Sequence, residues 1–351
     1  MNRDAIVGCI LGTAVGDALG LPYEGLSPKR AERLLGTPDR HRFFFGRGMI
    51  SDDTEHTCMV AQSLIEAGGN VDAFTKRFAR RLRWWILALP AGVGKATAIS
   101  GTKLWLGWKP QNAGVFSAGN GPAMRAAVFG AAIDDVTLLL ELIRASSRLT
   151  HSDPKADDGA ITVALAAKHA RQCASINAHV WLGEVVDAVG GDGAELIDLL
   201  RRAIDSVQAN ESTWAFAKSL GLQRGVTGYA YHTVPVAIHS WLSHPKDFRQ
   251  AVTTIIRCGG DADTTAAIVG GIVGAGVGPE GIPTDWLDRI REYPRRVRWM
   301  RELGEALADS LERNSVSRPP NINPIAVVVR NLLFLFIVLF HGFRRLAPPY
   351  R

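Results

Sequence analysis

Cysteine is scarce in this sequence, and the few cysteines form no motif. The chain has 351 residues and only four cysteines. They lie far apart, each in an apolar or mixed segment: Cys9, Cys58, Cys173 and Cys258. Cys-x-x-Cys pairs and the thiolate spacing of zinc sites are both missing. We therefore interpret the four side chains as buried free thiols in a reducing compartment.

Two other common signals are also missing. The first residues, Met1 to Asp4, lack the basic-then-apolar order and the cleavage site of a signal peptide. Alternating apolar runs bounded by hairpin turns are not evident, which argues against a β fold. We therefore expect a cytoplasmic protein that is not built from β-sheets.

The charge balance is mildly basic. Lys and Arg number 40 against 34 Asp and Glu, for a formal net charge of +6. Much of the excess lies in short clusters at residues 76–83 and 295–298. Such clusters can contact phosphates, but they more often form the solvated face of a helix. We therefore expect no nucleic-acid partner.

Apolar residues recur with helical spacing along most of the chain. Hydrophobic residues make up 47% of the sequence, which is enough for a large buried core. One apolar stripe begins at Ile6 and another at Met59. Spacings of three and four predict further helices over 136–146, 159–171, 194–207, 246–257 and 285–312. The prediction is an all-α fold, an orthogonal multi-helix bundle with long functional loops.

Small residues recur at every fourth position in two apolar segments. The first set is Gly8, Gly12, Gly16 and Gly20, and the second is Ala266, Gly270 and Gly274. This spacing places each set on one helix face and leaves a groove without side chains. A glycine inside a helix costs about 1 kcal/mol relative to alanine. We therefore expect close packing of these two helices to compensate, with the glycines forming the floor of the site.

The composition divides the chain into three parts. Residues 1–313 have the pattern of one large domain. Residues 314–324 are polar and rich in proline, which is typical of a linker. Residues 325–351 form a hydrophobic C-terminal tail.

The apolar part of the tail is interrupted by Arg330 and Asn331. It is shorter than the roughly 20 apolar residues that span a bilayer. We expect the tail to be separable from the activity of the domain and to contact a membrane surface. Three arginines would then meet anionic headgroups: Arg344, Arg345 and Arg351. The alternative is a terminal helix that packs on the bundle or on a partner.

The first motif whose side chains could bind a metal or take part in a reaction is Ser51-Asp52-Asp53-Thr54-Glu55. Adjacent carboxylates flanked by hydroxyls are hard oxygen ligands, which suit Mg²⁺, Mn²⁺ or Ca²⁺ rather than zinc. Taken alone, the motif is also typical of a helix start. Asp52 would then be the N-cap and Glu55 would complete a capping box.

The second motif, at residues 259–265, contains Asp261 and Asp263 in Asp-x-Asp order. This order places two carboxylates on the same side of an extended segment, where they could bind one ion or bridge two. A helix cap is again the alternative. If both motifs converge, four carboxylates would repel one another strongly without a cation. A pair of divalent cations is therefore the simplest explanation.

Four weaker features carry no function by themselves. Glu24 ends the first predicted helix, where a glutamate is usually solvated. Residues 119–125 look like a turn that opens a helix, with backbone N–H groups free to meet an anion. His151 begins a segment typical of a simple helix cap, and residues 228–233 are consistent with aromatic packing.

In chain order these motifs resemble the ADP-ribosylglycohydrolase family, which includes dinitrogenase-reductase-activating glycohydrolase and the ADP-ribosyl-acceptor hydrolases. The matching motifs, within roughly residues 4–310, are Gly-Asp-Ala-Leu-Gly…Glu, Ser-Asp-Asp-Thr, Gly-Asn-Gly-x-x-Met-Arg, Thr-His and Asp-x-Asp-Thr-x-Ala-Ala-Ile. Five short motifs in one order are far harder to meet by chance than any one alone. The resemblance implies an all-α hydrolase with two Mg²⁺ or Mn²⁺ ions in a cleft.

The resemblance also implies roles for individual residues. The metal ligands would be Ser51, Asp52, Asp53, Asp261, Asp263 and Thr264. Glu24 matches a glutamate proposed to act on water or to gate the site, and Asp53 and Asp263 would share in catalysis. ADP-ribose would be bound by Gly94, Ser117, Gly119, Asn120, Gly121, His151 and Tyr229.

The sequence departs from some relatives at Ala118, where they have an adenine-stacking tyrosine; Phe116 or Tyr229 would substitute. Residues 228–233 resemble the bacterial arginine-directed branch, so the expected substrate is an ADP-ribosyl-arginine on a protein. The alternative substrates are ADP-ribose linked to serine, poly-ADP-ribose, ADP-ribose esters and ADP-ribosylated nucleic-acid bases. A further alternative is a non-catalytic ADP-ribose-binding or structural member, although all four metal aspartates are present.

Overall fold

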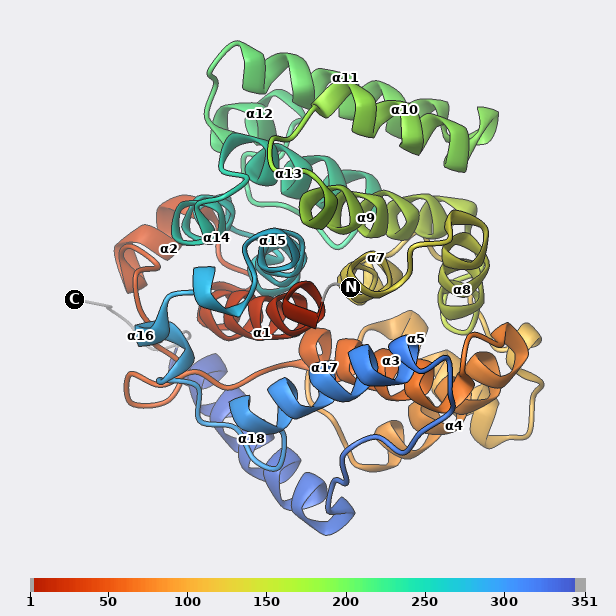
Figure 1. Ribbon diagram of the computed structural model, residues 1–351. Helices are drawn as coiled ribbons and strands as arrows, with labels where there is room; N and C mark the ends of the chain where they lie inside the picture. The colour runs from red at the N-terminus through yellow and green to blue at the C-terminus, as the bar shows by residue number, and fades with distance from the viewer. Residues whose placement is uncertain (1–2, 345–351) are drawn as a thin grey trace.

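The computed structural model describes residues 3–344, and their regular structure is entirely helical (Figure 1). Within these residues there are isolated β-bridges but no sheet. The predicted all-α fold is therefore confirmed. The α-helices are α1 Arg3–Gly20, α2 Pro28–Leu35, α3 Asp52–Ala67, α4 Val71–Leu87, α5 Lys95–Trp105, α6 Gly121–Met124, α7 Ala127–Ala132, α8 Val136–Arg148, α9 Pro154–Gln172, α10 Ala178–Val189, α11 Ala194–Gln208, α12 Thr213–Ser219, α13 Ala230–Ser243, α14 Phe248–Ile256, α15 Ala262–Val277, α16 Thr284–Leu287, α17 Val297–Glu312 and α18 Pro324–Arg344. Short 3₁₀ turns lie at Leu21–Tyr23 (η1), Pro110–Asn112 (η2), Gly191–Gly193 (η3) and Pro279–Gly281 (η4).

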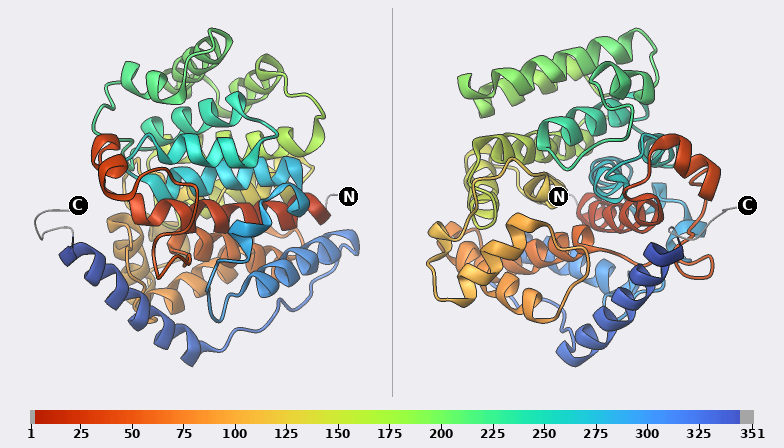
Figure 2. Two further views of the ribbon diagram at one scale, coloured as in Figure 1. Left: turned by 90° about the vertical axis from the view of Figure 1, so that its left-hand side faces the viewer. Right: turned by 180° about the vertical axis from the view of Figure 1, so that it is seen from behind.

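Helices α1 and α15 pack antiparallel at the centre of the bundle (Figures 1 and 2). A Cβ atom on Gly12 would lie 2.1 Å from the carbonyl oxygen of Gly270. The predicted close packing of the two glycine-spaced helices is therefore confirmed. Because a Cβ on Gly20 would meet Ala262, the C-terminal end of α1 lies against the N-terminal end of α15.

The helix predicted over 285–312 is wrong, because α16 ends at Leu287 and α17 begins at Val297. Pro294 lacks a backbone N–H and disfavours helical geometry in the residue before it. The non-helical segment instead bonds to the loop before α3. Arg291 N donates to Gly48 O at 2.8 Å, and Gly48 N donates to Arg289 O at 3.0 Å.

Residues 313–323 have no regular structure and lead along the bundle to α18. Ser317 N donates to Ile65 O at 3.2 Å, and Trp299 Nε1 donates to Asn321 O at 3.1 Å. Helix α18 crosses the lower side of the molecule (Figures 1 and 2).

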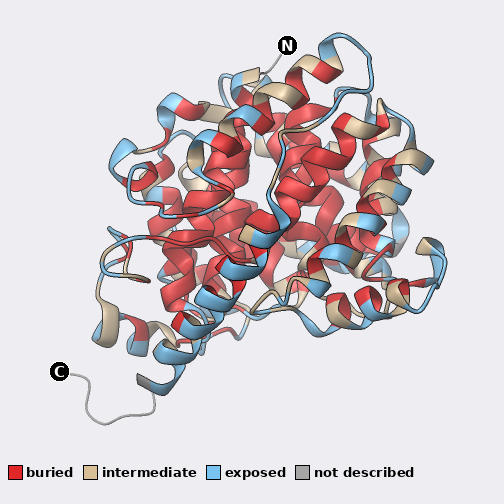
Figure 3. Cartoon of the chain, turned by 90° about the horizontal axis from the view of Figure 1, so that it is seen from below, coloured by how far each residue is buried: buried red, intermediate tan, exposed pale blue. Residues whose placement is uncertain are grey.

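Helix α18 has two different faces (Figure 3). One face is buried against the bundle and consists of Val327, Arg330, Asn331, Phe334 and Ile337. The opposite face is apolar and exposed, and we call it the outer face: Ile325, Val329, Leu332, Phe336, Leu339, Phe340 and Phe343. By length and hydropathy, Arg3–Tyr23 and Pro324–Phe343 could each cross a membrane. The first is wholly buried in the protein, whereas the second is 28% buried.

Candidate active site

Most of the predicted site residues line one cleft of about 390 Å³. These are Glu24, Ser51, Asp52, Gly94, Ser117, Gly119, Asn120, Gly121, His151, Asp261, Asp263 and Thr264. Asp53 is fully buried next to this lining. Tyr229 is not among the lining residues. Motifs more than 200 residues apart in the sequence therefore meet in one place.

The first acidic motif starts α3, but it does not form the capping box that was the alternative interpretation. Ser51 is the N-cap residue and its side chain makes no capping hydrogen bond. Its Oγ instead donates to Asp53 Oδ2 at 3.0 Å. Glu55 accepts a hydrogen bond from Arg295 Nη1 at 2.6 Å. The carboxylates of Asp52 and Asp53 are thus not used for helix capping.

Asp17 positions this motif, a role that was not predicted from the sequence. It is completely buried in α1 and accepts hydrogen bonds from Ser51 N at 2.9 Å and from Thr54 N at 3.2 Å. Burial raises the pKa of Asp17 to about 6, while the hydrogen bonds from Thr54 and Ser51 act in the opposite direction. The available signal was an aspartate inside an otherwise apolar helix, where a charge requires partners.

The second acidic motif starts α15, with Asp261 as its N-cap residue. The Asp261 side chain caps no backbone group of the helix. Its Oδ2 instead accepts a hydrogen bond from Asn120 Nδ2 at 2.6 Å, and the same nitrogen donates to Thr233 Oγ1 at 3.0 Å. Asp263 Oδ1 accepts from Thr264 N at 2.9 Å. Asn120, predicted as a substrate residue, therefore also orients a predicted metal ligand.

The carboxylates of the two motifs lie close enough to raise one another's pKa values. Burial is the largest cause of the raised pKa values of Asp52, Asp53 and Asp263. Repulsion adds to it, from Asp17 on Asp52 and Asp53, and from Glu24 on Asp263. So much buried negative charge is stable only with protons or cations.

The donor set fits a hard divalent cation. Asp53 Oδ1 is buried and has no hydrogen-bond partner among the described residues. The surrounding donors are carboxylate and hydroxyl oxygens, which Mg²⁺ and Mn²⁺ prefer. Within residues 3–344, no three His, Cys, Asp or Glu side chains are already arranged as a set that could hold an ion. The residues of the two acidic motifs thus fit a divalent cation chemically.

His151 lies against the glycine loop that precedes α6. A Cβ on Gly119 would lie 2.9 Å from His151 Nε2, and one on Gly121 would lie 2.8 Å from His151 Cε1. These positions are therefore glycine because the imidazole occupies the space. The ring Nδ1 lies 2.9 Å from Thr150 Oγ1. Burial, and next the charge of Arg125, lower the pKa of His151 to about 3, so its imidazole is neutral at pH 7.

The start of α5 forms another side of the cleft. Gly94 is its N-cap residue, and Lys95, Ala96 and Thr97 of its first turn also line the cleft. No atom lies within 4 Å of a Cβ placed on Gly94. Backbone N–H groups at a helix N-terminus are unsatisfied within the helix and bind phosphates readily.

Comparison with known protein families matches residues 1–317 to the family described as ADP-ribosylglycohydrolase. The chain belongs to the ADP-ribosylglycohydrolase family.

Individual relatives agree with this assignment. A protein of Archaeoglobus fulgidus described as uncharacterized is 33% identical, over 86% of this chain and 94% of its own length. ADP-ribosyl-[dinitrogen reductase] glycohydrolase of Rhodospirillum rubrum is 27% identical, over 84% and 95%. Human ADP-ribosylhydrolase ARH3 is 28% identical, over 87% and 92%. A solved ADP-ribosylglycohydrolase-related protein complex superposes with a TM-score of 0.63 at 27% identity, covering 88% of this chain and 99% of that chain.

Tyr229 and Phe116 are the two aromatic residues expected to substitute at the family's adenine-binding position. The Tyr229 hydroxyl accepts a hydrogen bond from Lys155 Nζ at 2.9 Å, and the backbone of Tyr229 bridges to Gly119. Phe116 is 78% exposed and lies next to Ser117, which lines the cleft. Phe116 is therefore the aromatic side chain whose faces are more open to a base.

Helix α18 lies beyond the part of the chain that matches the ADP-ribosylglycohydrolase family, which ends at residue 317. Phe334 and Val338 of this helix nevertheless line the same cleft as the acidic motifs. The sequence reading placed no site residue in the tail.

Proposed function

We propose that this protein hydrolyses the bond between ADP-ribose and an arginine side chain of a modified protein, with two divalent cations in the cleft. Family membership establishes the coarser statement, that the chain is a hydrolase that removes ADP-ribose from an acceptor. The arginine acceptor and the two cations are supported by one observation: the two acidic motifs and the N-terminus of α5 line the same cleft. Carboxylates suit cations and a guanidinium, whereas the N-terminus of α5 suits a pyrophosphate.

Six residues would hold two Mg²⁺ or Mn²⁺ ions: Ser51, Asp52, Asp53, Asp261, Asp263 and Thr264. The unpartnered Oδ1 of Asp53 and the mutual repulsion of the aspartates support this assignment. The chemistry that such ions supply is polarisation of nearby oxygen atoms and a lowered pKa of water.

The remaining steps fall to side chains of the cleft. Glu24 is exposed at the cleft and is the candidate base that removes a proton from the attacking water. The carboxylates of Asp53 and Asp263 stabilise the positive charge that develops on the ribose as the acceptor leaves. The N-terminus of α5 and residues 119–121 hold the pyrophosphate and ribose, which orients the bond to be cleaved.

The acceptor is tested with two peptides, one carrying ADP-ribosyl-arginine and one carrying ADP-ribosyl-serine. Release of ADP-ribose is measured with Mg²⁺, with Mn²⁺ and after chelation. The proposal predicts faster release from arginine and loss of release on chelation. Faster release from serine would contradict the arginine assignment alone. Release from neither peptide, while ADP-ribose still binds, would favour a non-catalytic member of the family.

We also propose that the outer face of α18 docks on an anionic membrane surface in the cytoplasm. The outer face is a continuous exposed apolar stripe. A groove of about 970 Å³ runs beside it. Its lining is mostly apolar and includes more arginines (Arg291, Arg296, Arg298 and Arg330) than acidic residues (Asp288 and Glu292). The sequence after Phe343 adds Arg344, Arg345 and Arg351. Apolar surface with flanking arginines is the combination that binds anionic bilayers.

Sedimentation with vesicles tests this docking. The protein should pellet with vesicles containing phosphatidylglycerol and much less with pure phosphatidylcholine. The double variant Leu332→Ser and Phe336→Ser should remain in the supernatant. Equal binding of both vesicles would refute the role of charge. Dimerisation through α18 without vesicle binding would show that a second copy covers this face instead.

A further inference from the structure

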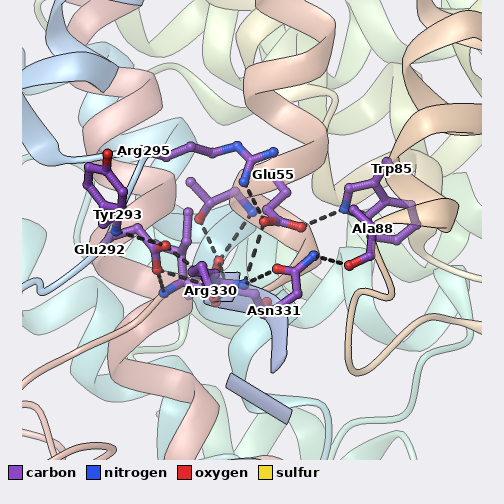
Figure 4. Close-up of polar contacts among 12 residues, drawn as sticks. Glu55, Trp85, Ala88, Glu292, Tyr293, Arg295, Arg330 and Asn331 are labelled. Carbon is purple, nitrogen blue, oxygen red and sulfur yellow. Dashed lines mark hydrogen bonds and ion pairs between the residues drawn. The ribbon is translucent and has the colours of Figure 1, made fainter. Parts of the chain in front are cut away.

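Arg330 of α18 forms a buried ion pair with Glu292, which lies between α16 and α17 (Figure 4). Arg330 Nε donates to Glu292 Oε1 at 2.8 Å, and Nη2 donates to Oε2 at 2.9 Å. The two side chains are only 5% and 0% exposed. Such a two-point pair is strong when both charges are satisfied, and removal of one partner leaves a buried charge.

The Arg330–Glu292 pair holds both backbone polar groups of Ile50. Ile50 N donates to Glu292 Oε2 at 3.3 Å, and Ile50 O accepts a hydrogen bond from Arg330 Nη2. Ile50 is followed directly by Ser51, the first predicted metal ligand. Asp17 holds the next N–H, that of Ser51. The chain is therefore fixed at two successive residues as it enters the acidic motif.

Asn331 makes a second connection, to the end of α4. Its Nδ2 donates to Ala88 O at 2.8 Å, and its Oδ1 accepts from Arg330 Nη1 at 3.1 Å (Figure 4). Ala88 leads into a short loop in which Gly92 and Gly94 line the cleft. Two adjacent side chains of α18 thus contact the segments leading to the acidic motif and to the α5 N-terminus.

Phe334 and Val338 lie one and two turns farther along the same side of α18. Phe334 packs on Phe43 with ring centroids 5.4 Å apart, and the Arg330 guanidinium lies 4.4 Å from its ring centroid. Both Phe334 and Val338 line the cleft together with Leu21 and Ala91. They form part of an apolar side of the cleft.

We propose that α18 is part of the active site although it lies outside the family match. Arg330 and Asn331 are positioning residues that hold the acidic motif and the loop before α5 in a fixed relation. Phe334 and Val338 form one side of the substrate cleft. This inference rests on the proposed function, and it replaces the expectation that the tail is separable from activity. The two polar residues that interrupt the apolar tail are the ones that make these contacts.

The test compares five variants with the wild-type full chain, including Arg330→Lys as the conservative change. Arg330→Gln removes the ion pair, Asn331→Ala removes the contact to Ala88, and Val338→Ala widens the cleft. Arg249→Gln is the matched control, because it removes an ion pair with Asp285 on the exposed surface. Each protein is measured for Mn²⁺ affinity by electron paramagnetic resonance, ADP-ribose affinity by calorimetry, kcat, KM and Tm.

Arg330→Gln should lower Mn²⁺ affinity and kcat by about 10–100-fold, as expected when a contact that orients ligands is lost. Arg330→Lys should restore part of the Mn²⁺ affinity and part of kcat, because lysine keeps the positive charge. The restoration should be incomplete, because lysine cannot make the two-point contact. Asn331→Ala and Val338→Ala should raise KM and weaken ADP-ribose binding, with Mn²⁺ affinity unchanged. Arg249→Gln should match the wild type.

The proposal is overturned if folded Arg330→Gln keeps wild-type Mn²⁺ affinity and kcat. If Arg330→Gln does not fold, the other two variants decide. The proposal is then overturned if Asn331→Ala and Val338→Ala both have the KM and the ADP-ribose affinity of the wild type. These results differ from failure of the proposed function, in which the wild type itself would neither bind Mn²⁺ nor release ADP-ribose.

Discussion

Asn120 Nδ2 lies 2.6 Å from Asp261 Oδ2, so one hydrogen bond links the glycine loop before α6 to the acidic motif that starts α15. The same amide nitrogen bonds to Thr233 of α13. An amide held by two elements fixes the direction of the carboxylate that it contacts. The predicted substrate loop and the predicted metal-binding motif are thus parts of one hydrogen-bonded arrangement.

Asn120→Ala should lower kcat/KM by about 10–100-fold, which is typical when a residue that orients a metal ligand is lost. Mn²⁺ affinity should fall as well, because Asp261 loses its partner. The control is Asn112→Ala, at an exposed position outside the cleft lining. Steady-state kinetics and Mn²⁺ titration measure both effects. Unchanged Mn²⁺ affinity in Asn120→Ala would confine its role to substrate.

Gly12→Ala should destabilise the protein by about 1–3 kcal/mol or prevent folding, because overpacking displaces backbone. The new Cβ would lie 2.1 Å from the Gly270 carbonyl oxygen. Gly183→Ala is the matched control, because it lies in α10 with no atom within 4 Å of the new Cβ. It should stabilise by about 0.4–1 kcal/mol. Urea unfolding measures both, and equal stability of the two variants would contradict the close crossing.

The contribution of His239 to the unfolding free energy should fall as the pH drops from 6.5 to 4. Burial is the main reason that the pKa of His239 is lowered from 6.5 to about 4. Over this range the unfolded chain binds a proton that the folded protein excludes, so acidification favours unfolding. The contribution of this residue approaches about 1.4 kcal/mol per pH unit. The buried aspartates have raised pKa values and act in the opposite direction in both proteins, so His239 is isolated by the difference between the wild type and His239→Gln. The unfolding free energy of the wild type should fall relative to that of His239→Gln by this amount on acidification; parallel curves for the two proteins would contradict this role of His239.

Glu24→Gln should lower kcat by about 10²–10⁴-fold if Glu24 is the general base, with ADP-ribose affinity little changed. Its carboxylate lies in the cleft and acts electrostatically on Asp52 and Asp263. The control is Glu32→Gln, at an exposed position on α2. A small rate effect combined with weakened Mn²⁺ affinity would instead identify Glu24 as a ligand or gate.

The helical fold was predictable from local patterns, whereas most of the cleft residues were predicted from the resemblance to the family. Glycines at every fourth position specify a close helix crossing, because spacing alone determines which residues share a face. The acidic motifs were recognisable because several oxygen ligands stand together in each short segment. Neither the helix crossing nor the acidic motifs had to be inferred from contacts between distant segments. Only the joint metal site did, because it requires the two acidic motifs to lie close together.

The partners of Asp17, Glu292 and Arg330 could not be found in this way, although Asp17 and Arg330 stand out as charges in apolar segments. Each is a single charged residue whose partners lie far away in the sequence; Arg330 and its acceptor Ile50 are 280 residues apart. Spacing rules carry no information about such pairs. Within the segment 285–312, Pro294 does indicate a break in the helix, whereas the apolar periodicity on its two sides belongs to two separate helices, α16 and α17.

The most direct test of the proposed chemistry is the rate of ADP-ribose release from an ADP-ribosyl-arginine peptide by the wild type and Asp263→Ala. Both are measured with Mn²⁺ and after exhaustive chelation, with circular dichroism to confirm the helical fold. The account predicts release by the Mn²⁺-loaded wild type only, with Asp263→Ala inactive and still helical. Full release by Asp263→Ala, or by the chelated wild type, would contradict the metal-dependent mechanism.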